Sequence, residues 1–384
     1  MRATEVAIVG GGVIGLSCAR ELTRAGAGVT VLEAGVAVGR GSSSRANGGV
    51  RAQFTTAINI AFSRFSIEAL EELERSVGGL GFHQTGYLLI AGTNESERAL
   101  HDACELQRGL GVDTDWLEPE QVVAQAPFVR PDGVRGGTFH ARDGFLDPAG
   151  LVASLAGEAR RLGAKVLTDA RVESIDPGFV IQHARGRVRA DVVVNAAGAD
   201  ARTLAALAGG DVPVEPVRRN LAHVMDPATG RAGAAGGLTP MTVDMDTGVL
   251  IRREPAGGWI VAYSDPNDPP GPDTAVDPRF LTDLAERLPN RFPFLLELPI
   301  DPSHCWAGLY PETPDHHAIV GEDPAVPGLF HCVGFGGHGL MHAPAAGRAI
   351  AELITTGRCD TFDLRALRPS RFADGDLVVE ASVL

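Results

Sequence analysis

The sequence has one lysine, Lys165, five cysteines and no long apolar run. The net charge of −14 argues against a nucleic-acid partner, because phosphate-binding surfaces need clustered Lys and Arg. The five cysteines are widely spaced and show no metal-ligand spacing, which predicts a reducing compartment, the cytoplasm, and no metal site. No apolar run reaches about eighteen residues, so we expect no membrane span.

A glycine fingerprint stands at the start of the chain. An apolar strand over residues 6–9 runs directly into Gly10, Gly12 and Gly15 and then into a helical pattern. Such glycines let the strand turn tightly, let backbone approach a pyrophosphate and let helix pack on strand, so this run is no signal segment. A second strand over 28–32 ends in Glu33, placed to accept both ribose hydroxyls of an adenosine. Together these features predict a nucleotide site.

The whole chain of 384 residues is long enough for two or three compact units and a large core. Hydrophobic periodicity and turn residues divide it into expected elements. In chain order these are a donor-rich loop over 39–51, a long amphipathic helix over 58–73, a strand over 82–91, a helix over 151–162 opened by Asp147-Pro148, strands at 165–167 and 190–198, an antiparallel-leaning region over about 213–304, a strand over 328–334 and a helix over 344–355. The nucleotide domain is thus assembled from separated segments.

A glycine-rich turn precedes the last of these helices. Glycines at 334, 336, 337 and 339 leave backbone amides exposed at the helix N-terminus, where the helix dipole favours anionic character in a ligand. A reduced flavin is such an anion.

These motifs together resemble those of the D-amino-acid oxidase superfamily of FAD proteins. Within it the similarity is to sarcosine oxidases, β subunits of proline dehydrogenase and glycine oxidases, and it covers nearly the whole chain. The segments that carry it are the 10–15 fingerprint with Glu33, the 42–51 loop, Asp147-Pro148, the 195–198 strand end, the stretch 306–315 and the stretch 334–341.

The resemblance implies an α/β fold (α+β overall), with a Rossmann-type FAD-binding domain and a discontinuous, mostly antiparallel sheet forming the substrate domain. The implied FAD-binding domain comprises residues 1–80, 146–212 and 305–370. The implied substrate domain comprises 81–145 and 213–304, and 371–384 form a C-terminal tail.

The resemblance also implies the cofactor-binding residues. Gly10, Gly12 and Gly15 would hold the pyrophosphate, Glu33 the ribose, and the backbone of Val172 the adenine. The full expected set is Gly10, Gly12, Val13, Ile14, Gly15, Glu33, Ala34, Arg40, Gly41, Ser42, Ser43, Asn47, Gly48, Gly49, Val172, Ala197, Gly198, Gly308, Phe335, Gly336, Gly337, His338 and Gly339.

Two residues match catalytic-site positions of the sarcosine oxidase branch. Arg51 stands where an arginine grips the substrate carboxylate, a task that suits the bidentate geometry of a guanidinium, and Tyr310 stands where a residue flanks the amine. Each residue also has a purely structural interpretation: Arg51 could form an ion pair at the domain junction, and Tyr310 could be a core aromatic residue. Met341 replaces a lysine of that branch, so a single cation, or another arginine such as Arg252 or Arg253, would have to suffice.

Covalent members attach flavin through Cys or His where this chain has Gly308 and Arg45, so the resemblance implies non-covalent FAD. The expected reaction is hydride removal from the carbon next to a neutral amine, with hydrolysis of the resulting imine, on a small amino acid or secondary amine. The alternatives are a 2-hydroxy-acid dehydrogenase, or a flavoprotein subunit or assembly partner in a hetero-oligomer. The electron acceptor is oxygen or a protein or quinone, and the scarcity of lysine favours an acceptor other than oxygen.

Four histidines receive interpretations of their own. His338 is expected to act through its backbone amide. His316 and His317 form an adjacent pair, but no further ligands stand at useful spacing, so we expect no metal there. His331, in a predicted buried strand, is interpreted as a core histidine with satisfied hydrogen bonds.

Overall fold

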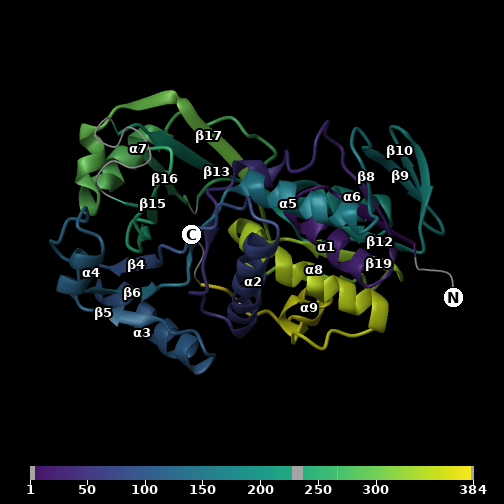
Figure 1. The fold of residues 1–384 in the computed structure, drawn as a ribbon, viewed down its shortest axis with the longest axis horizontal. Coiled ribbons are helices and arrows are strands. Elements are labelled where there is room, and N and C mark those ends of the chain that lie inside the picture. The colour runs from purple at the N-terminus through teal and green to yellow at the C-terminus, as the bar shows by residue number, and fades with distance from the viewer. Residues whose placement is uncertain (1–4, 227–236, 266, 382–384) are drawn as a thin grey trace.

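The computed structural model describes residues 5–226, 237–265 and 267–381 (Figure 1). The parts of the predicted domains at 1–4, 227–236, 266 and 382–384 lie outside the described residues. Two large sheets dominate the fold, one in each half of the molecule as drawn in Figure 1. The α/β character expected from the sequence is confirmed by this arrangement and by the relatives described below.

The first sheet has six strands in the order β18-β19-β12-β1-β2-β8. Their bounds are β1 (Glu5–Val9), β2 (Gly28–Leu32), β8 (Lys165–Leu167), β12 (Val192–Asn195), β18 (Ile319–Glu322) and β19 (Leu329–Val333). All neighbouring strands are parallel except β18 and β19, which are antiparallel. The strand predicted over 190–198 corresponds to β12, which spans only Val192–Asn195 and pairs in parallel with β1.

Helices cover this sheet and join it to the rest of the molecule. They are α1 (Val13–Arg24), α2 (Ala57–Ser76), α5 (Pro148–Arg161), α6 (Ala201–Leu207) and α8 (Gly339–Thr356). Helices α1 and α8 lie so close that a Cβ on Gly347 would stand 2.5 Å from the Ser17 hydroxyl oxygen. Helix α5 begins as its sequence predicts, with the Asp147 carboxylate accepting a hydrogen bond of 2.9 Å from the Ala149 amide.

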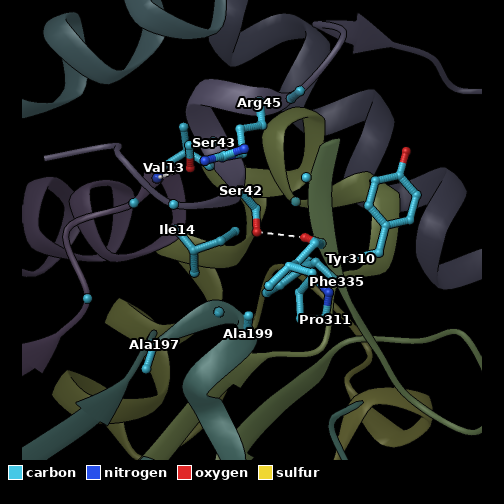
Figure 2. Close-up of a pocket in the computed structure, with 18 of the residues that line it drawn as sticks. Val13, Ile14, Ser42, Ser43, Arg45, Ala197, Ala199, Tyr310, Pro311 and Phe335 are labelled. Atoms are coloured by element: carbon cyan, nitrogen blue, oxygen red, sulfur yellow. Dashed lines mark hydrogen bonds between the residues drawn. The ribbon is translucent and has the colours of Figure 1, made fainter. Parts of the chain in front are cut away.

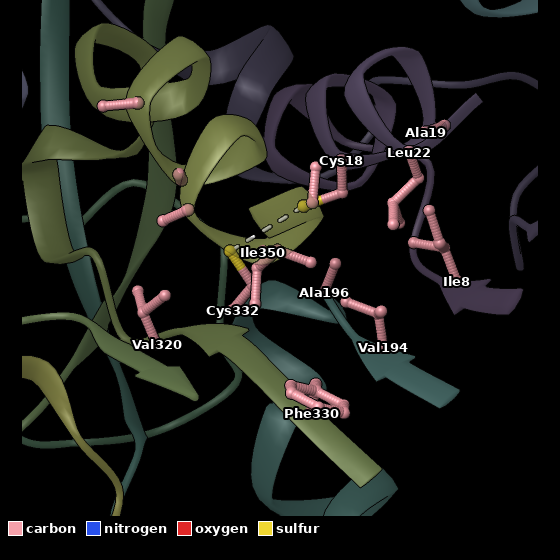
Figure 3. Close-up of a cluster of buried hydrophobic side chains, with 14 of the residues drawn as sticks. Ile8, Cys18, Ala19, Leu22, Val194, Ala196, Val320, Phe330, Cys332 and Ile350 are labelled. Carbon is pink, nitrogen blue, oxygen red and sulfur yellow. Dashed lines mark hydrogen bonds between the residues drawn. The ribbon is translucent and has the colours of Figure 1, made fainter. Parts of the chain in front are cut away.

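The core under α1 and α8 is apolar and tightly packed. Figure 3 shows Ile8, Leu22, Val194 and Ile350 meeting there from two strands and two helices. The same core holds Cys18 and Cys332, whose sulfur atoms lie 3.9 Å apart as free thiols. Burial raises the pKa of the Cys332 thiol well above its usual value, so this pair belongs to the core.

The second sheet has eight strands in the order β17-β13-β16-β15-β14-β4-β6-β5. Their bounds are β4 (Tyr87–Ala91), β5 (Asp115–Leu117), β6 (Gly136–His140), β13 (Glu215–Val224), β14 (Met241–Asp244), β15 (Val249–Arg253), β16 (Trp259–Tyr263) and β17 (Ile300–Glu312). Its pairings are antiparallel except β4 with β14. One face packs on helix α7 (Phe280–Arg287) through a large apolar cluster.

The remaining elements are short or peripheral. They are β3 (Gly49–Val50), β7 (Gly144–Phe145), β9 (Val172–Asp176), β10 (Val180–His183), β11 (Gly186–Arg189), α3 (Asn94–Gly109), α4 (Pro119–Gln125) and α9 (Arg371–Asp374). Several predicted boundaries differ from the structure by a few residues, and two of these differences have a clear physical interest. The strand expected over 82–91 begins only at Tyr87, and the helix expected from Pro344 begins at Gly339. Glycines at the start of α8 hide its first turn from a periodicity argument, and the helix accommodates Pro344 in its interior.

The C-terminal segment packs into the fold. The Arg371 guanidinium donates to the Asp315 carboxylate at 2.7 and 2.9 Å, and both side chains are fully buried. The Glu380 carboxylate, also buried, accepts hydrogen bonds from the Thr55 amide and the Thr56 hydroxyl at the start of α2. Among the described residues, no helix is long and apolar enough to cross a membrane.

Candidate active site

One large cavity, of about 570 Å³, runs between the two sheets. It begins at the turn between β1 and α1, passes the 40–49 loop, and ends against β13, β16 and β17. Figure 2 shows this enclosure, with Val13 and Ser43 on one side and Tyr310 and Phe335 on another. The cavity therefore joins the glycine fingerprint to the inner face of the second sheet.

Two glycines at the fingerprint end tolerate no side chain. Gly10 has φ +112°, and a Cβ there would lie 2.2 Å from the Ala196 carbonyl oxygen. A Cβ on Gly15 would lie 1.9 Å from the Gly10 carbonyl oxygen. The close approach of α1 to β1 thus requires glycine, and it directs the N-terminus of α1 at the cavity, where an anionic group is favoured.

Glu33 lies at the end of β2, where the sequence predicts it. One carboxylate oxygen accepts a hydrogen bond from the Gly11 amide and the other from the Gly35 amide, each at 2.7 Å. These bonds hold the side chain at the cavity wall, and each oxygen keeps a second lone pair for a hydroxyl donor.

The donor-rich loop is tied to β17 across the cavity. The Ser42 hydroxyl donates to the Leu309 carbonyl oxygen at 2.6 Å, the dashed line in Figure 2. Arg45 donates to the Ala307 carbonyl oxygen at 2.6 Å, and the Trp306 indole donates to the Arg45 carbonyl oxygen at 3.0 Å. These bonds join residues more than 260 positions apart in the chain.

The N-terminal turn of α8 packs against Tyr310. A Cβ on Gly337 would lie 2.6 Å from the tyrosine ring, so the backbone of this turn lies directly on the phenol. Gly334 and Gly336 have φ values of +73° and +49°, which favour glycine. Tyr310 is half-buried and lines the cavity; desolvation raises the pKa of its phenol, so this hydroxyl stays protonated near neutral pH.

Most of the expected cofactor-binding residues line the cavity. Those that do are Gly10, Gly12, Val13, Ile14, Glu33, Ala34, Arg40, Gly41, Ser42, Ser43, Asn47, Gly48, Gly49, Val172, Ala197, Gly198, Gly308, Phe335, Gly336, Gly337 and Gly339. Gly15 and His338 do not. Gly15 serves the packing of α1 on β1, and the His338 ring packs edge-on against Phe54 at 4.8 Å.

Arg51 lies behind the cavity wall with 1% of its surface exposed. Its guanidinium carbon stands 3.9 Å from the centre of the Phe54 ring, and it donates to the Gln53 carbonyl oxygen. Burial lowers the pKa of Arg51, while the nearby Tyr87, Glu380, Asp143 and Tyr310 favour its charged form. Arg51 and Tyr310 are thus electrostatically coupled, although only Tyr310 lines the cavity.

The other histidines have structural partners. His331 is fully buried between the Asp323 carboxylate, at 2.8 Å, and the Asn195 amide, at 3.3 Å, and burial lowers the pKa of the ring. His316 contacts Glu312 at 3.1 Å, and His317 contacts Thr56 at 2.9 Å. Among the described residues, no group of three or more acidic, His or Cys side chains could hold a metal ion.

The sequence argument missed several residues at the far end of the cavity. They are Arg219, Leu221, Leu250, Ala262, Ser264, Pro272 and Thr274, all from the second sheet or its loops. One signal was available for Arg219: it stands between Val217 and Leu221 at the spacing of one strand face. A charged residue on an otherwise apolar strand face marks a candidate site.

The cavity fits FAD at its nucleotide end. Its glycine turns would collide with added side chains, its helix termini present backbone amides, and Glu33 is held where a ribose would lie. These are properties of a dinucleotide site rather than of an ordinary turn.

Comparisons with known proteins agree with this geometry. The family model described as "FAD dependent oxidoreductase" (DAO) matches residues 5–353. FAD-dependent oxidoreductase domain-containing protein 1 of Xenopus laevis is 29% identical, over 99% of this chain and 85% of that protein. The crystal structure of L-proline dehydrogenase from P. horikoshii superposes with a TM-score of 0.91 at 29% identity, covering 98% of this chain and 100% of that chain. Glycine oxidase from Geobacillus kaustophilus gives a TM-score of 0.84 at 27% identity, covering 97% of this chain and 99% of that one.

The family match spans nearly all of the described chain, and it includes both the fingerprint and the α8 turn. The expected resemblance, the FAD cofactor and the enzymatic character are thereby confirmed. This chain belongs to the DAO family of FAD-dependent oxidoreductases.

Proposed function

We propose that this enzyme oxidises the C–N bond of a small amino acid or secondary amine. The observation that carries the proposal is the course of the cavity, which leads from the glycine fingerprint to the phenol of Tyr310, with the buried Arg51 behind the cavity wall. The names of two similar structures, a proline dehydrogenase and a glycine oxidase, point to the same substrate class.

When bound, FAD supplies the hydride acceptor for this chemistry. In this proposal Arg51, which lies behind the cavity wall in the structure, turns towards the cavity and pairs with the substrate carboxylate, which would hold the carbon next to the amine in a reactive position. Tyr310 stays protonated, walls the pocket and excludes water. The backbone amides at the start of α8 stabilise negative charge at the cofactor edge. Water then hydrolyses the imine product, and no protein base is needed if the amine binds neutral.

We propose non-covalent FAD, because Gly308 and Arg45 provide no nucleophile at the positions where covalent relatives attach flavin. All five cysteines are unpaired, which supports a reducing compartment such as the cytoplasm. The single lysine lies on β8 in the nucleotide half, and this favours an acceptor other than oxygen. Rapid peroxide formation in air would contradict that choice.

Anaerobic reduction of the flavin tests the proposal. The purified protein is mixed in turn with sarcosine, L-proline, glycine, D-amino acids and 2-hydroxyglutarate while absorbance near 450 nm is followed. Bleaching by an amine supports the proposal. Bleaching by 2-hydroxyglutarate alone would indicate a hydroxy-acid dehydrogenase, and a yellow protein that nothing reduces would indicate a subunit role.

A variant sharpens this test. Arg51→Gln should raise the amine concentration needed for half-maximal bleaching by about 100-fold, because a buried charge-assisted pair with the carboxylate is lost. If R51Q and the wild type bleach at the same amine concentration, Arg51 does not bind the substrate.

A further inference from the structure

A second arginine lies at the substrate end of the cavity. Arg219, on β13, is nine-tenths buried, with 9% of its surface exposed, and it lines the cavity wall. It pairs with Gly308 of β17, so strand alternation puts its side chain on the same sheet face as Tyr310. Its guanidinium carbon lies 5.4 Å from the centre of the Tyr310 ring.

The hydrogen bonds of Arg219 are incomplete. Its Nε has no hydrogen-bond partner among the described residues, although the atom is buried. Nη1 donates to the Arg218 carbonyl oxygen at 2.9 Å and forms an ion pair with the Asp268 carboxylate at 3.7 Å, a separation too long for a hydrogen bond. A buried guanidinium with an unused donor is costly unless a ligand completes it.

Arg252 lies on the same face of the eight-stranded sheet as Arg219, but its donors are satisfied by the protein. Its Nε donates to the Asn47 carbonyl oxygen at 2.7 Å, and its Nη2 pairs with the Glu254 carboxylate at 2.5 Å. Arg252 is therefore already occupied by the protein, whereas Arg219 keeps a donor for another partner.

The surroundings of Arg219 suit an anion. The acidic side chains that line the cavity are Glu33 and Asp200, and both belong to the nucleotide half. At the opposite end the polar neighbours are the hydroxyl residues Ser264 and Thr274. Among the described residues, the cavity lining at this end therefore holds no acidic side chain, and Asp268, which lies near the Arg219 guanidinium, stands outside that lining. Hydroxyl groups can donate to a carboxylate.

We propose that Arg219 binds a second anionic group of the substrate, in addition to the carboxylate assigned to Arg51. The substrate would then be an amine that carries two acidic groups, for example an amino acid with an acidic side chain or an acidic substituent on nitrogen. This inference rests on the proposed function, because it takes the substrate to lie beside FAD with one carboxylate on Arg51.

Carboxylate titrations of the FAD-loaded protein test it. Succinate and glutarate are compared with propionate and butyrate, and binding is followed as a flavin difference spectrum. The wild type should prefer the dicarboxylates. Arg219→Gln should weaken them by about 10- to 100-fold, the effect of losing one charge-assisted hydrogen bond, and change monocarboxylate binding by less than about twofold.

Arg218→Gln is the matched control. Arg218 is the next residue on β13 and pairs with the Asp277 carboxylate at 2.8 Å, outside the cavity lining. It should leave both ligand classes unchanged. If R219Q does not retain FAD, Arg219→Lys carries the test, because lysine keeps the charge but lacks the Nε donor, and it should also weaken dicarboxylates selectively.

The outcomes separate this inference from the proposed function. Equal weakening of both ligand classes by R219Q or R219K would overturn the inference, since Arg219 would then act on the cofactor or the fold. Monocarboxylate binding that depends on Arg51, without any dicarboxylate preference, would overturn the inference alone. A wild type whose flavin responds to no carboxylate, and which no amine bleaches, would overturn both.

Discussion

The two ends of the cavity are built in different ways. At the nucleotide end, several short, glycine-rich segments form much of the wall, and Gly10 and Gly15 leave no room for side chains. At the substrate end, side chains such as Arg219 and Tyr310 arrive from strands β13 and β17, far from the fingerprint in sequence. The first end is specified by steric exclusion, the second by charge and long-range contacts. Mutations at the nucleotide end should therefore reduce stability and FAD binding, whereas mutations at the substrate end should reduce ligand affinity.

The largest effect is expected at the fingerprint. Gly15→Ala places a Cβ 1.9 Å from the Gly10 carbonyl oxygen, so α1 must move away from β1. We expect a loss of more than about 3 kcal/mol in the free energy of unfolding and a protein that purifies without FAD absorbance. The control is Gly157→Ala in α5, where a Cβ meets nothing within 4 Å and helix propensity predicts a gain of about 0.5–1 kcal/mol. A yellow, stable G15A protein would refute steric specification of this end.

The next effect concerns the C-terminal segment, which packs on the start of α2. The Glu380 carboxylate accepts hydrogen bonds from the Thr55 amide at 2.9 Å, the Thr56 hydroxyl at 2.7 Å and the Asn59 amide at 3.0 Å. Glu380→Ala leaves these donors at the start of α2 buried without that acceptor. We expect chemical denaturation to show a loss of about 2–4 kcal/mol, with Glu380→Gln losing less.

Glu72→Ala provides the comparison for Glu380. Glu72 pairs with Arg75 on the exposed side of α2, where its side chain is 60% exposed, so its removal should cost about 0–1 kcal/mol. Equal free energies of unfolding for E380A and E72A would mean that the contacts of Glu380 with the start of α2 do not stabilise the protein.

Acid should destabilise the protein through three buried histidines. Burial lowers the pKa of His342 to about 3, and burial also lowers the pKa values of His317 and His338. The unfolded chain binds protons at these sites near pH 6.5 and the folded protein does not, so stability present above that pH is lost as pH falls. Each such site contributes a slope of up to about 1.4 kcal/mol per pH unit below about pH 6.5.

His342→Gln tests this slope while keeping a side chain able to contact Ser63, which lies 2.9 Å from the His342 ring nitrogen. Urea unfolding at pH 7.5, 6.0 and 5.0, with the same excess of FAD, should give a shallower decline than in the wild type, by about 1 kcal/mol per pH unit. His101→Gln, at an exposed position on α3, should leave the slope unchanged. An unchanged slope in H342Q would show that other groups cause the acid loss.

The contrast between the two ends explains what the sequence could predict. The fingerprint, Glu33 and the Asp147 cap are local patterns, and each has its steric or hydrogen-bonding reason within a short stretch of chain. The order of the eight-stranded sheet is not local. Residues 87–90 pair in parallel with residues 241–244, and no spacing in either segment indicates the other. The resemblance supplied the fold there, and it did not supply Arg219.

The buried position of Glu380 was equally hidden. Its neighbours Val378 and Val379 are exposed, so the segment reads as a solvated tail until its contacts with Thr55 and Thr56 are seen. A single buried carboxylate in an exposed segment has no periodic signature, since its partners come from another part of the chain.

The smallest effect is expected where the two ends are joined. Ser42→Ala removes the 2.6 Å hydrogen bond to the Leu309 carbonyl oxygen, one neutral bond worth about 1 kcal/mol, so FAD affinity should fall about fivefold. Ser44→Ala is the control, because Ser44 is exposed and bonds only within its own loop, to the Gly41 carbonyl oxygen. FAD titration by flavin fluorescence measures both. An unchanged affinity would mean that the loop is positioned by Arg45 and Trp306 alone, whereas a loss above about 50-fold would show that the Ser42 hydroxyl also contacts the cofactor.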